Sequence, residues 1–133
     1  MLEALLKPQT IAVIGASRTP GKVGHEVVRN LLEGGFQGRV VPVNPSAAEI
    51  LGLKCYSDLR SFGQPTDLSV IAVPPPAVRG AVESSIAARA QAVVVITAGF
   101  KEVGPEGAAL ERELATLCAD HGVRLMGPNC LGL

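Results

Sequence analysis

Aromatic side chains are almost absent from this chain of 133 residues, which has one tyrosine, three phenylalanines and no tryptophan, together 3% of the sequence. Hydrophobic residues nevertheless make up 47% of it. A core must therefore be built from valine, isoleucine, leucine and alanine. Aliphatic runs of this kind are typical of a parallel sheet buried on both faces, where apolar and polar residues need not alternate. The length fits one domain with a substantial core.

Net charge is also absent, because 12 lysines and arginines balance 12 aspartates and glutamates and no block of like charge occurs. Nucleic acids and anionic membrane surfaces attract clustered basic residues, so neither is expected as a partner. No run approaches the roughly 20 apolar residues that cross a bilayer. The N-terminal segment 1–8 lacks the pattern of a signal peptide. We expect a cytoplasmic protein.

Paired cysteines and metal-ligand clusters are lacking as well. The three cysteines, Cys55, Cys118 and Cys130, leave one unpaired under any disulfide scheme, and none lies in a C-x-x-C motif. Reduced thiols fit a cytosolic setting. The two histidines, His25 and His121, are far apart in the sequence. We therefore predict no metal site.

Short aliphatic runs recur along the chain, and each stops in a cluster of small or turn-forming residues. These runs are predicted as strands, and stretches with helical spacing of apolar residues lie between them. The predicted strands are 10–14, 39–44, 54–56, 67–73, 92–97 and 123–126. The predicted helices are 23–32, a turn or two at 47–51, a short capped helix at 57–61, and longer helices at 76–90 and 105–121.

Strands that alternate with helices across short connections predict right-handed crossovers and a doubly wound parallel sheet, a Rossmann-like α/β fold in a single domain. We expect strand order 3-2-1-4-5-6, with the reversal between the strand that ends at Gly15 and the one that ends at Val73. The strand 92–97 is the most hydrophobic and is expected at the centre. Pro42 is tolerable only if its missing N–H faces away from a partner strand or falls at a bulge.

The clusters at the strand ends carry the functional signal. In a parallel sheet they share one edge, where they would form a crevice of backbone N–H groups suited to an extended, phosphate-bearing cofactor. The first cluster, 15–24, leads into a helix whose N-terminus favours an anion. There Gly15 lets a phosphate come close, Ser17 can donate its hydroxyl, and Arg18 or Lys22 can pair with phosphate charge.

This loop matches neither of two common phosphate-binding motifs. Ser17 stands where G-x-G-x-x-G has its second glycine, and the loop contains no G-K-[ST]. The carboxylate that would hold the ribose of NAD is also missing after the second strand, since 43–46 reads V-N-P-S and the next acidic residue is Glu49. These departures weigh against NAD(H). A tight turn with solvated basic residues is the structural alternative.

Five segments follow one another along the chain: I-G-A-S at 14–17, P-V-N-P at 42–45, V-P-P at 73–75, I-T-A-G-F at 96–100 and G-P-N-C-L-G at 127–132. In this order they resemble the CoA-binding domain of NDP-forming acyl-CoA synthetases. That group includes ADP-forming acetyl-CoA synthetase, the α subunit of succinyl-CoA synthetase and related protein acetyltransferases. The resemblance spans essentially the whole chain and implies coenzyme A (CoA) as the cofactor.

The resemblance also implies which residues contact CoA. The first segment would cradle the phosphates, the second line the nucleotide end, the third lie beside the pantetheine and the fourth near its thiol. With Lys22 added from the loop, the predicted CoA-binding residues are Gly15, Ala16, Ser17, Arg18, Lys22, Val43, Asn44, Pro45, Val73, Pro74, Pro75, Thr97, Ala98, Gly99 and Phe100. Ser46 replaces a lysine frequent in the family, so a contact to the 3′-phosphate or adenine is expected to be weaker or to come from elsewhere.

No catalytic residue is predicted here. The resemblance places the phosphorylated histidine and the ATP-grasp domain in partner domains or a partner subunit. His25 and His121 are interpreted as structural, Cys118 as core packing, and Cys130 has no adjacent histidine to activate it.

The chain stops seven residues after Met126, before any helix could cover the last strand. We therefore interpret 1–133 as a CoA-binding domain from a longer multidomain protein, an ADP-forming acyl-CoA synthetase or an acetyltransferase fusion. Taken alone, it would bind CoA or acyl-CoA and catalyse nothing. The alternatives are an NAD(H)-binding redox or metabolite sensor and a stand-alone regulatory CoA-binding protein.

Overall fold

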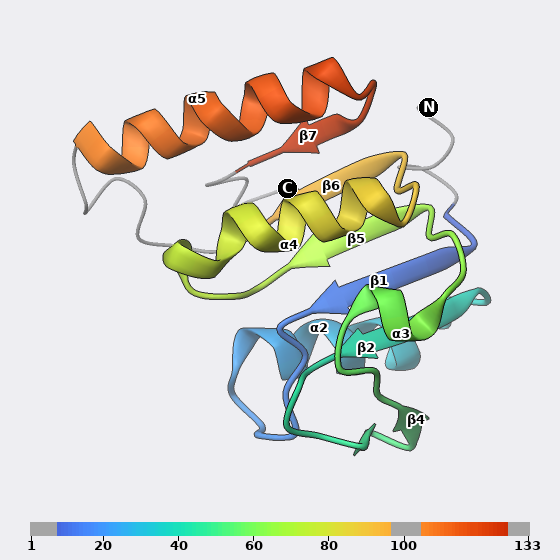
Figure 1. Cartoon of the computed structure of the whole chain (residues 1–133). Coiled ribbons are helices and arrows are strands. Elements are labelled where there is room, and N and C mark those ends of the chain that lie inside the picture. Colours follow the sequence, from blue (N-terminus) through green and yellow to red (C-terminus); the bar gives the residue numbers. More distant parts are fainter. Residues whose placement is uncertain (1–7, 97–104, 128–133) are drawn as a thin grey trace.

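The computed structural model describes residues 8–96 and 105–127 (Figure 1). The elements are β1 (Thr10–Ile14), α2 (Val23–Glu33), β2 (Arg39–Val43), β3 (Glu49–Ile50), β4 (Leu53–Lys54), α3 (Leu59–Phe62), β5 (Leu68–Ile71), α4 (Pro75–Ala87), β6 (Ala92–Val95), α5 (Pro105–Asp120) and β7 (Arg124–Met126). Strands and helices alternate along most of the chain, which confirms the predicted α/β class.

Five strands form one parallel sheet in the order β2-β1-β5-β6-β7. Because β1 pairs with both β2 and β5, the winding reverses at β1, as predicted. Tyr56 adds an isolated parallel bridge to Val43. The predicted third strand is therefore in its expected place beside β2 but is reduced to one bridge. The strand predicted at 92–97 is β6, which lies inside the sheet between β5 and β7 as the predicted order requires, although the middle strand is β5.

Pro42 satisfies the condition set by its missing N–H group. Its carbonyl oxygen accepts a hydrogen bond from the N–H of Tyr56 at 3.0 Å, whereas the carbonyl of Val43, the next residue, accepts from Gly15 at the end of β1. The N–H and C=O of one strand residue point to the same side, so the proline nitrogen faces away from β1. The ladder between β1 and β2 therefore loses no bond.

The predicted helical turn at 47–51 is wrong, because this segment enters an antiparallel hairpin in which β3 pairs with β4. Leu51 and Gly52 form the turn, with φ values of 50° and 81°. Two positive φ angles are typical of a turn that matches the twist of a hairpin. Ile50 is 1% exposed and belongs to the core cluster that also contains Val28 of α2. Burial of Ile50 outweighs the weak helical tendency of so short a segment.

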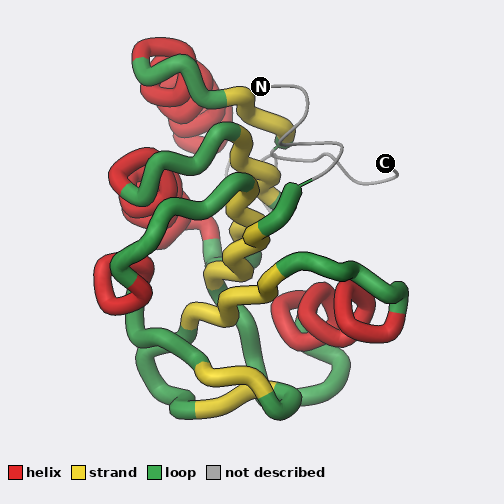
Figure 2. Tube along the Cα trace, turned by 90° about the vertical axis from the view of Figure 1, so that its right-hand side faces the viewer, coloured by secondary structure: helices red, strands yellow, loops and turns green. Residues whose placement is uncertain are grey.

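Helices cover both faces of the sheet, as the prediction of a doubly wound fold requires. Figures 1 and 2 show α2 on one side of the strands and the other three helices on the opposite side. Alternate residues of β1 reach the two sides: Ile11 and Val13 belong to the cluster that contains Val28 of α2, whereas Ala12 and Ile14 belong to the cluster under α3, α4 and α5. This alternation follows from the pleat of the strand.

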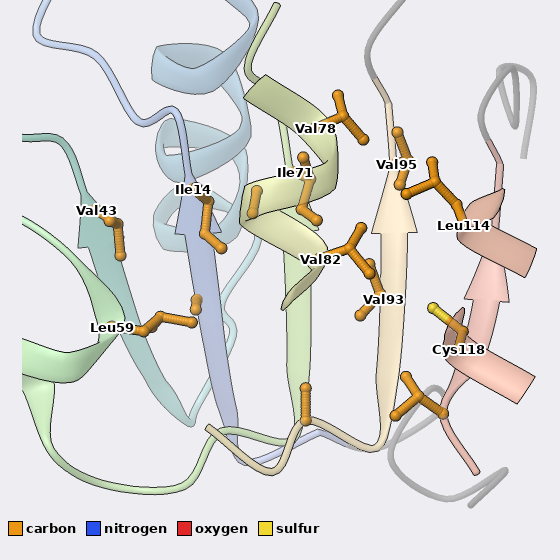
Figure 3. Packing of buried hydrophobic residues seen from close by; sticks show 14 of the residues in the cluster. Ile14, Val43, Leu59, Ile71, Val78, Val82, Val93, Val95, Leu114 and Cys118 are labelled. Atoms are coloured by element: carbon orange, nitrogen blue, oxygen red, sulfur yellow. The ribbon is translucent and has the colours of Figure 1, made fainter. Parts of the chain in front are cut away.

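The larger cluster is built from aliphatic side chains, as the composition predicts. Figure 3 shows residues of α4 and α5 packed over the strands. Val78 and Val82, one turn apart on α4, are both 0% exposed, and so are Val93 and Val95 of β6 and Leu114 of α5. These contacts attach α4 and α5 to the sheet.

The described helices end in similar backbone conformations, but the residue after α4 differs from the others in a way that the sequence did not reveal. Each of the four helices in the described ranges has a residue with positive φ one or two positions past its end, which lets the last carbonyl groups find donors. Three of these residues are glycines, at positions 35, 63 and 122, with φ of 79°, 71° and 68°. After α4 the residue is Arg89, at φ 62°. A residue with a Cβ atom is less stable in this conformation by about 1–2 kcal/mol.

We expect Leu114→Ala to lower the free energy of unfolding by about 2–5 kcal/mol, because it leaves a cavity where α5 meets the sheet. Urea titration followed by circular dichroism measures the change. Thr116→Ala, on the exposed side of α5, is the control and should change stability by no more than about 0.5 kcal/mol. Equal effects of the two variants would contradict the packing described.

Candidate ligand-binding site

The carboxyl ends of the parallel strands lie at one edge of the sheet. The register places Ile14 beside both Val43 and Ile71, and Ile71 beside Val95. The predicted shared edge is therefore confirmed for the strands that the structure describes. The predicted contacts Thr97, Ala98, Gly99 and Phe100 lie outside the described residues, as does Cys130.

The loop 15–22 between β1 and α2 depends on two glycines that lie in close contact. A Cβ atom on Gly24, in the first turn of α2, would lie 1.9 Å from the carbonyl oxygen of Gly15. A Cβ atom on Gly15, which has φ +96°, would lie 2.6 Å from the carbonyl oxygen of Ala72. Only residues without a side chain allow α2 to begin this close to the strand ends. Gly24 was not among the predicted site residues.

Side chains hold the carbonyl groups of this loop. Asn44, just after β2, donates from Nδ2 to the carbonyl oxygen of Ala16 at 2.7 Å, and its Oδ1 accepts from the N–H of Ser46 at 2.7 Å. His25, which is 6% exposed, donates from Nδ1 to the carbonyl oxygen of Ser17 at 2.9 Å. A carbonyl oxygen only accepts, so Nδ1 carries a proton. This contact agrees with a structural role for His25.

Three successive N–H groups of the same loop are unpaired within the described residues. Within 8–96 and 105–127, nothing accepts from the N–H of Ala16, Ser17 or Arg18. The N–H of Thr19 donates to Ser17 Oγ at 3.0 Å, which tightens the turn. Unpaired N–H groups in a loop that leads into a helix, together with the positive end of that helix dipole, are suited to an anion. The exposed side chains of Arg18 and Lys22 add positive charge there.

One carboxylate also reaches this loop, but it is already engaged. Glu26 Oε2 accepts from the N–H of Gly21 at 3.1 Å, and Oε1 accepts from Arg29 Nε at 2.9 Å. These hydrogen bonds, with that from Gly21 the largest, hold the pKa of Glu26 below its ordinary value. Glu26 therefore stays ionised and supports the turn at Gly21, while its charge is offset by Arg29.

The helix α4 begins at the same edge but offers no comparable donors. Pro75 and Pro76 have no N–H, and the N–H of Ala77 already donates to the carbonyl oxygen of Pro74 at 2.9 Å. Prolines are favourable in a first helical turn, so the run both ends the strand and starts the helix. Of these two helix starts, that of α2 is the one suited to an anion, whereas the start of α4 is formed by prolines without N–H groups.

A hollow of about 360 Å³ lies at this edge, between the ends of β1 and β2 and the helices α3 and α4. The predicted residues that line it are Gly15, Val43, Asn44, Pro45 and Val73. Ala16, Ser17, Arg18 and Lys22 lie on the adjoining loop, and Pro74 and Pro75 at the start of α4. A larger hollow of about 880 Å³, beside the start of β2, contains none of the predicted residues.

Further lining residues were not predicted. They are Ile14, Ser57, Asp58, Leu59, Ala77, Ala81 and Ser84. Those of α4 follow one another at intervals of four and three, so helical spacing could have assigned them to one face. Those that begin α3 reach the crevice because the hairpin and the short helix bring the chain back beside β2, which no sequence pattern indicated.

Asp58 supplies the carboxylate of the crevice. Its Oδ1 accepts from the N–H of Ser61 at 2.7 Å and from Ser61 Oγ at 2.8 Å, so it caps α3 as predicted. These bonds, the backbone one first, lower the pKa of Asp58. An acidic group therefore lies at the crevice after all, although it belongs to α3 and not to the end of β2.

The described residues contain no group of three or more histidine, cysteine, aspartate or glutamate side chains able to hold a metal ion. Cys55 and Cys118 are free thiols, and burial raises the pKa of both. Both thiols are therefore poorly reactive.

None of the helices described is long and apolar enough to span a membrane. His121 is exposed and donates from Nδ1 to the carbonyl oxygen of Leu117 at 2.9 Å.

A family model described as a CoA binding domain matches residues 9–133, so the chain belongs to this CoA-binding domain family. It is 47% identical over 132 residues to acetate–CoA ligase (ADP-forming) I of Archaeoglobus fulgidus, covering 99% of this chain and 19% of that protein. It is 41% identical over 134 residues to acetate–CoA ligase (ADP-forming) II subunit alpha of Pyrococcus furiosus, covering 100% of this chain and 29% of that subunit. The chain thus spans less than a third of these relatives.

Solved structures give the same result. The dinucleotide-forming acetyl-coenzyme A synthetase 1 of Ca. Korarchaeum cryptofilum, solved with phosphate and ADP, superposes with a TM-score of 0.90 at 45% identity. The match covers 97% of this chain and 27% of that one. The predicted resemblance to ADP-forming acyl-CoA synthetases and the Rossmann-like fold are therefore confirmed.

We expect Gly24→Ala to destabilise the domain by about 1–3 kcal/mol, because the new methyl group would overlap the carbonyl oxygen of Gly15. Gly80→Ala in α4 is the matched control: a Cβ atom there meets nothing within 4 Å. The control should be stabilising by about 0.5–1 kcal/mol, the helical preference of alanine over glycine. Thermal unfolding measures both, and a neutral Gly24→Ala would contradict the close contact.

Proposed function

We propose that this chain binds coenzyme A, with the diphosphate at the loop 15–22 and the remainder of the molecule along the crevice. The observation that carries this proposal is that carbonyl groups of the loop are engaged in hydrogen bonds while three of its N–H groups are not. Asn44 and His25 hold its carbonyl groups, whereas the N–H groups of three successive residues have no acceptor in the described ranges. Membership of a CoA-binding domain family supports the choice of ligand.

The lining residues suit the parts of CoA differently. Arg18 and Lys22 would offset the phosphate charge. Val43, Asn44 and Pro45 would border the nucleotide end. Val73, Pro74 and Pro75 form an apolar wall suited to pantetheine, and 97–100 would lie toward the thiol.

We further propose that the domain serves a larger ADP-forming acyl-CoA synthetase. Such an enzyme interconverts acyl-CoA, ADP and phosphate with the free acid, CoA and ATP through a phosphohistidine, which would lie in another domain. Relatives named for acetate, trans-feruloyl-CoA and 4-hydroxybutyrate are 47%, 40% and 36% identical to this chain. Because similar domains accompany such different acyl groups, the choice of acyl group would lie outside this domain.

NAD(H) binding is the second candidate, and Asp58 is the observation that favours testing it. A carboxylate beside the nucleotide end of a Rossmann-like crevice can accept hydrogen bonds from a ribose diol. It comes from α3, however, and not from the end of β2.

Thermal unfolding of the domain with CoA, dephospho-CoA or NADH compares these ligands directly. A ligand that binds only the folded state raises the melting temperature as its concentration increases. We expect CoA to raise it and NADH to leave it unchanged. A rise with NADH alone would overturn the proposal in favour of the second candidate.

The variant Ser17→Asp tests the phosphate loop itself. An aspartate can still accept from the N–H of Thr19, so the turn is kept, but it sets a negative charge against the diphosphate. We expect CoA affinity to fall about tenfold or more, since hydrogen bonds to charged groups contribute about 1.5–3 kcal/mol. Calorimetry measures the affinity, with Thr116→Asp on the exposed side of α5 as the charge-matched control. Equal affinities for both variants would place the phosphates elsewhere.

A further inference from the structure

The crevice continues into a second hollow. This hollow, of about 780 Å³, lies between α3 and the C-terminal half of α4. The two hollows share the lining residues Asp58, Leu59 and Ser84. The two hollows therefore adjoin each other along α4, the first at the carboxyl edge of the sheet and the second toward the opposite edge, and together they are called the groove.

The two ends of the groove differ in charge. The lining of the first hollow includes no lysine or arginine, whereas Arg60 and Arg89 line the second, together with the neutral Gln64 and the carboxylate of Asp58, which lines both. Both guanidinium groups belong to exposed residues. Neither forms an ion pair with any residue in the described ranges, where the paired arginines are Arg29 and Arg79.

The backbone at Arg89 is a second, independent feature. It occupies the left-handed position after α4 for which the other described helices use glycine. Glycine would be more stable in this backbone conformation, so the choice of arginine here prompts the question of what its side chain does. One possible role is structural, because a cation near the C-terminus of α4 is favourable; another is to bind a ligand.

We propose that Arg60 and Arg89 form a binding site for a phosphate monoester at this end of the groove. Two guanidinium groups provide planar sets of N–H donors that match phosphate oxygens, and the Gln64 amide can add another donor. The phosphate has two sources: the 3′-phosphate of CoA, in which case the inference rests on the proposed function, or a separate small phosphate ester.

Titration of the domain with inorganic phosphate, followed by amide chemical shifts, tests the site without CoA. Saturable shifts are expected around positions 60, 64 and 89, and the affinity should fall about tenfold in Arg60→Gln and in Arg89→Gly, the loss of one charge-assisted contact. Arg89→Lys, which keeps the charge, should lose less. The absence of saturable shifts in the wild-type domain, or equal affinity in all variants, would overturn the proposal.

Melting temperatures of the same variants separate binding from a structural role. If the side chain acts through a ligand, Arg89→Gly melts no lower than the wild type in phosphate-free buffer while phosphate binding is lost. A lower melting temperature with unchanged phosphate affinity would show that Arg89 only stabilises the end of α4, and would overturn the proposal.

The ratio of CoA to dephospho-CoA affinity identifies the source of the phosphate. If the 3′-phosphate occupies the site, that ratio falls to about one in Arg89→Gly. If a separate ester occupies the site, that ratio is unchanged and phosphate still binds when CoA is saturating. Either result supports the site, provided the variants weaken phosphate binding. Failure of the wild-type domain to bind CoA would overturn the proposed function, whereas the phosphate titration would still decide independently whether the arginine site exists.

Discussion

The contact between the backbones of Gly15 and Gly24 is the constraint on which the candidate ligand edge depends, that is, the edge of the sheet where the carboxyl ends of the parallel strands lie. It brings the first turn of α2 against the end of β1 and directs the start of that helix toward the crevice. Because the positive end of the helix dipole acts only over the first turn, the distance between the helix start and the strand ends decides whether an anion there is stabilised. The surrounding hydrogen bonds from Asn44 and His25 refine a geometry that the two glycines make possible.

The rest of the fold holds this edge in place through aliphatic packing. Branched side chains of β1, β5 and β6 reach both faces of the sheet, and α2 and α4 are packed on opposite sides of it. Among the described residues, α2 contacts mainly β1 and β2, whereas α4 contacts mainly β5 and β6, so the two helices that border this edge are attached to neighbouring strands of one sheet. Loop residues are positioned by a rigid scaffold, which is the usual arrangement in Rossmann-like domains.

Much of this could be predicted from the sequence, for identifiable reasons. Aliphatic runs that end in glycine, asparagine or proline indicated the parallel sheet, its order and its ligand edge. The hairpin at 49–54 was missed because its signal lies in burial of Ile50, a tertiary effect that no local pattern reports. The sequence predicted a short capped helix at 57–61 but did not place Asp58 at the crevice, since its position depends on how the chain returns beside β2.

The two helices at this edge begin in opposite ways: α2 follows a loop with unpaired N–H groups at 16–18, whereas α4 starts with consecutive prolines. This asymmetry gives the edge a polarity. An elongated molecule with one charged half and one neutral half has a single favourable orientation there, since reversing it would bring the charged half against a surface without donors. The prolines at the start of α4 thus decide which end of such a molecule would face a neighbouring domain.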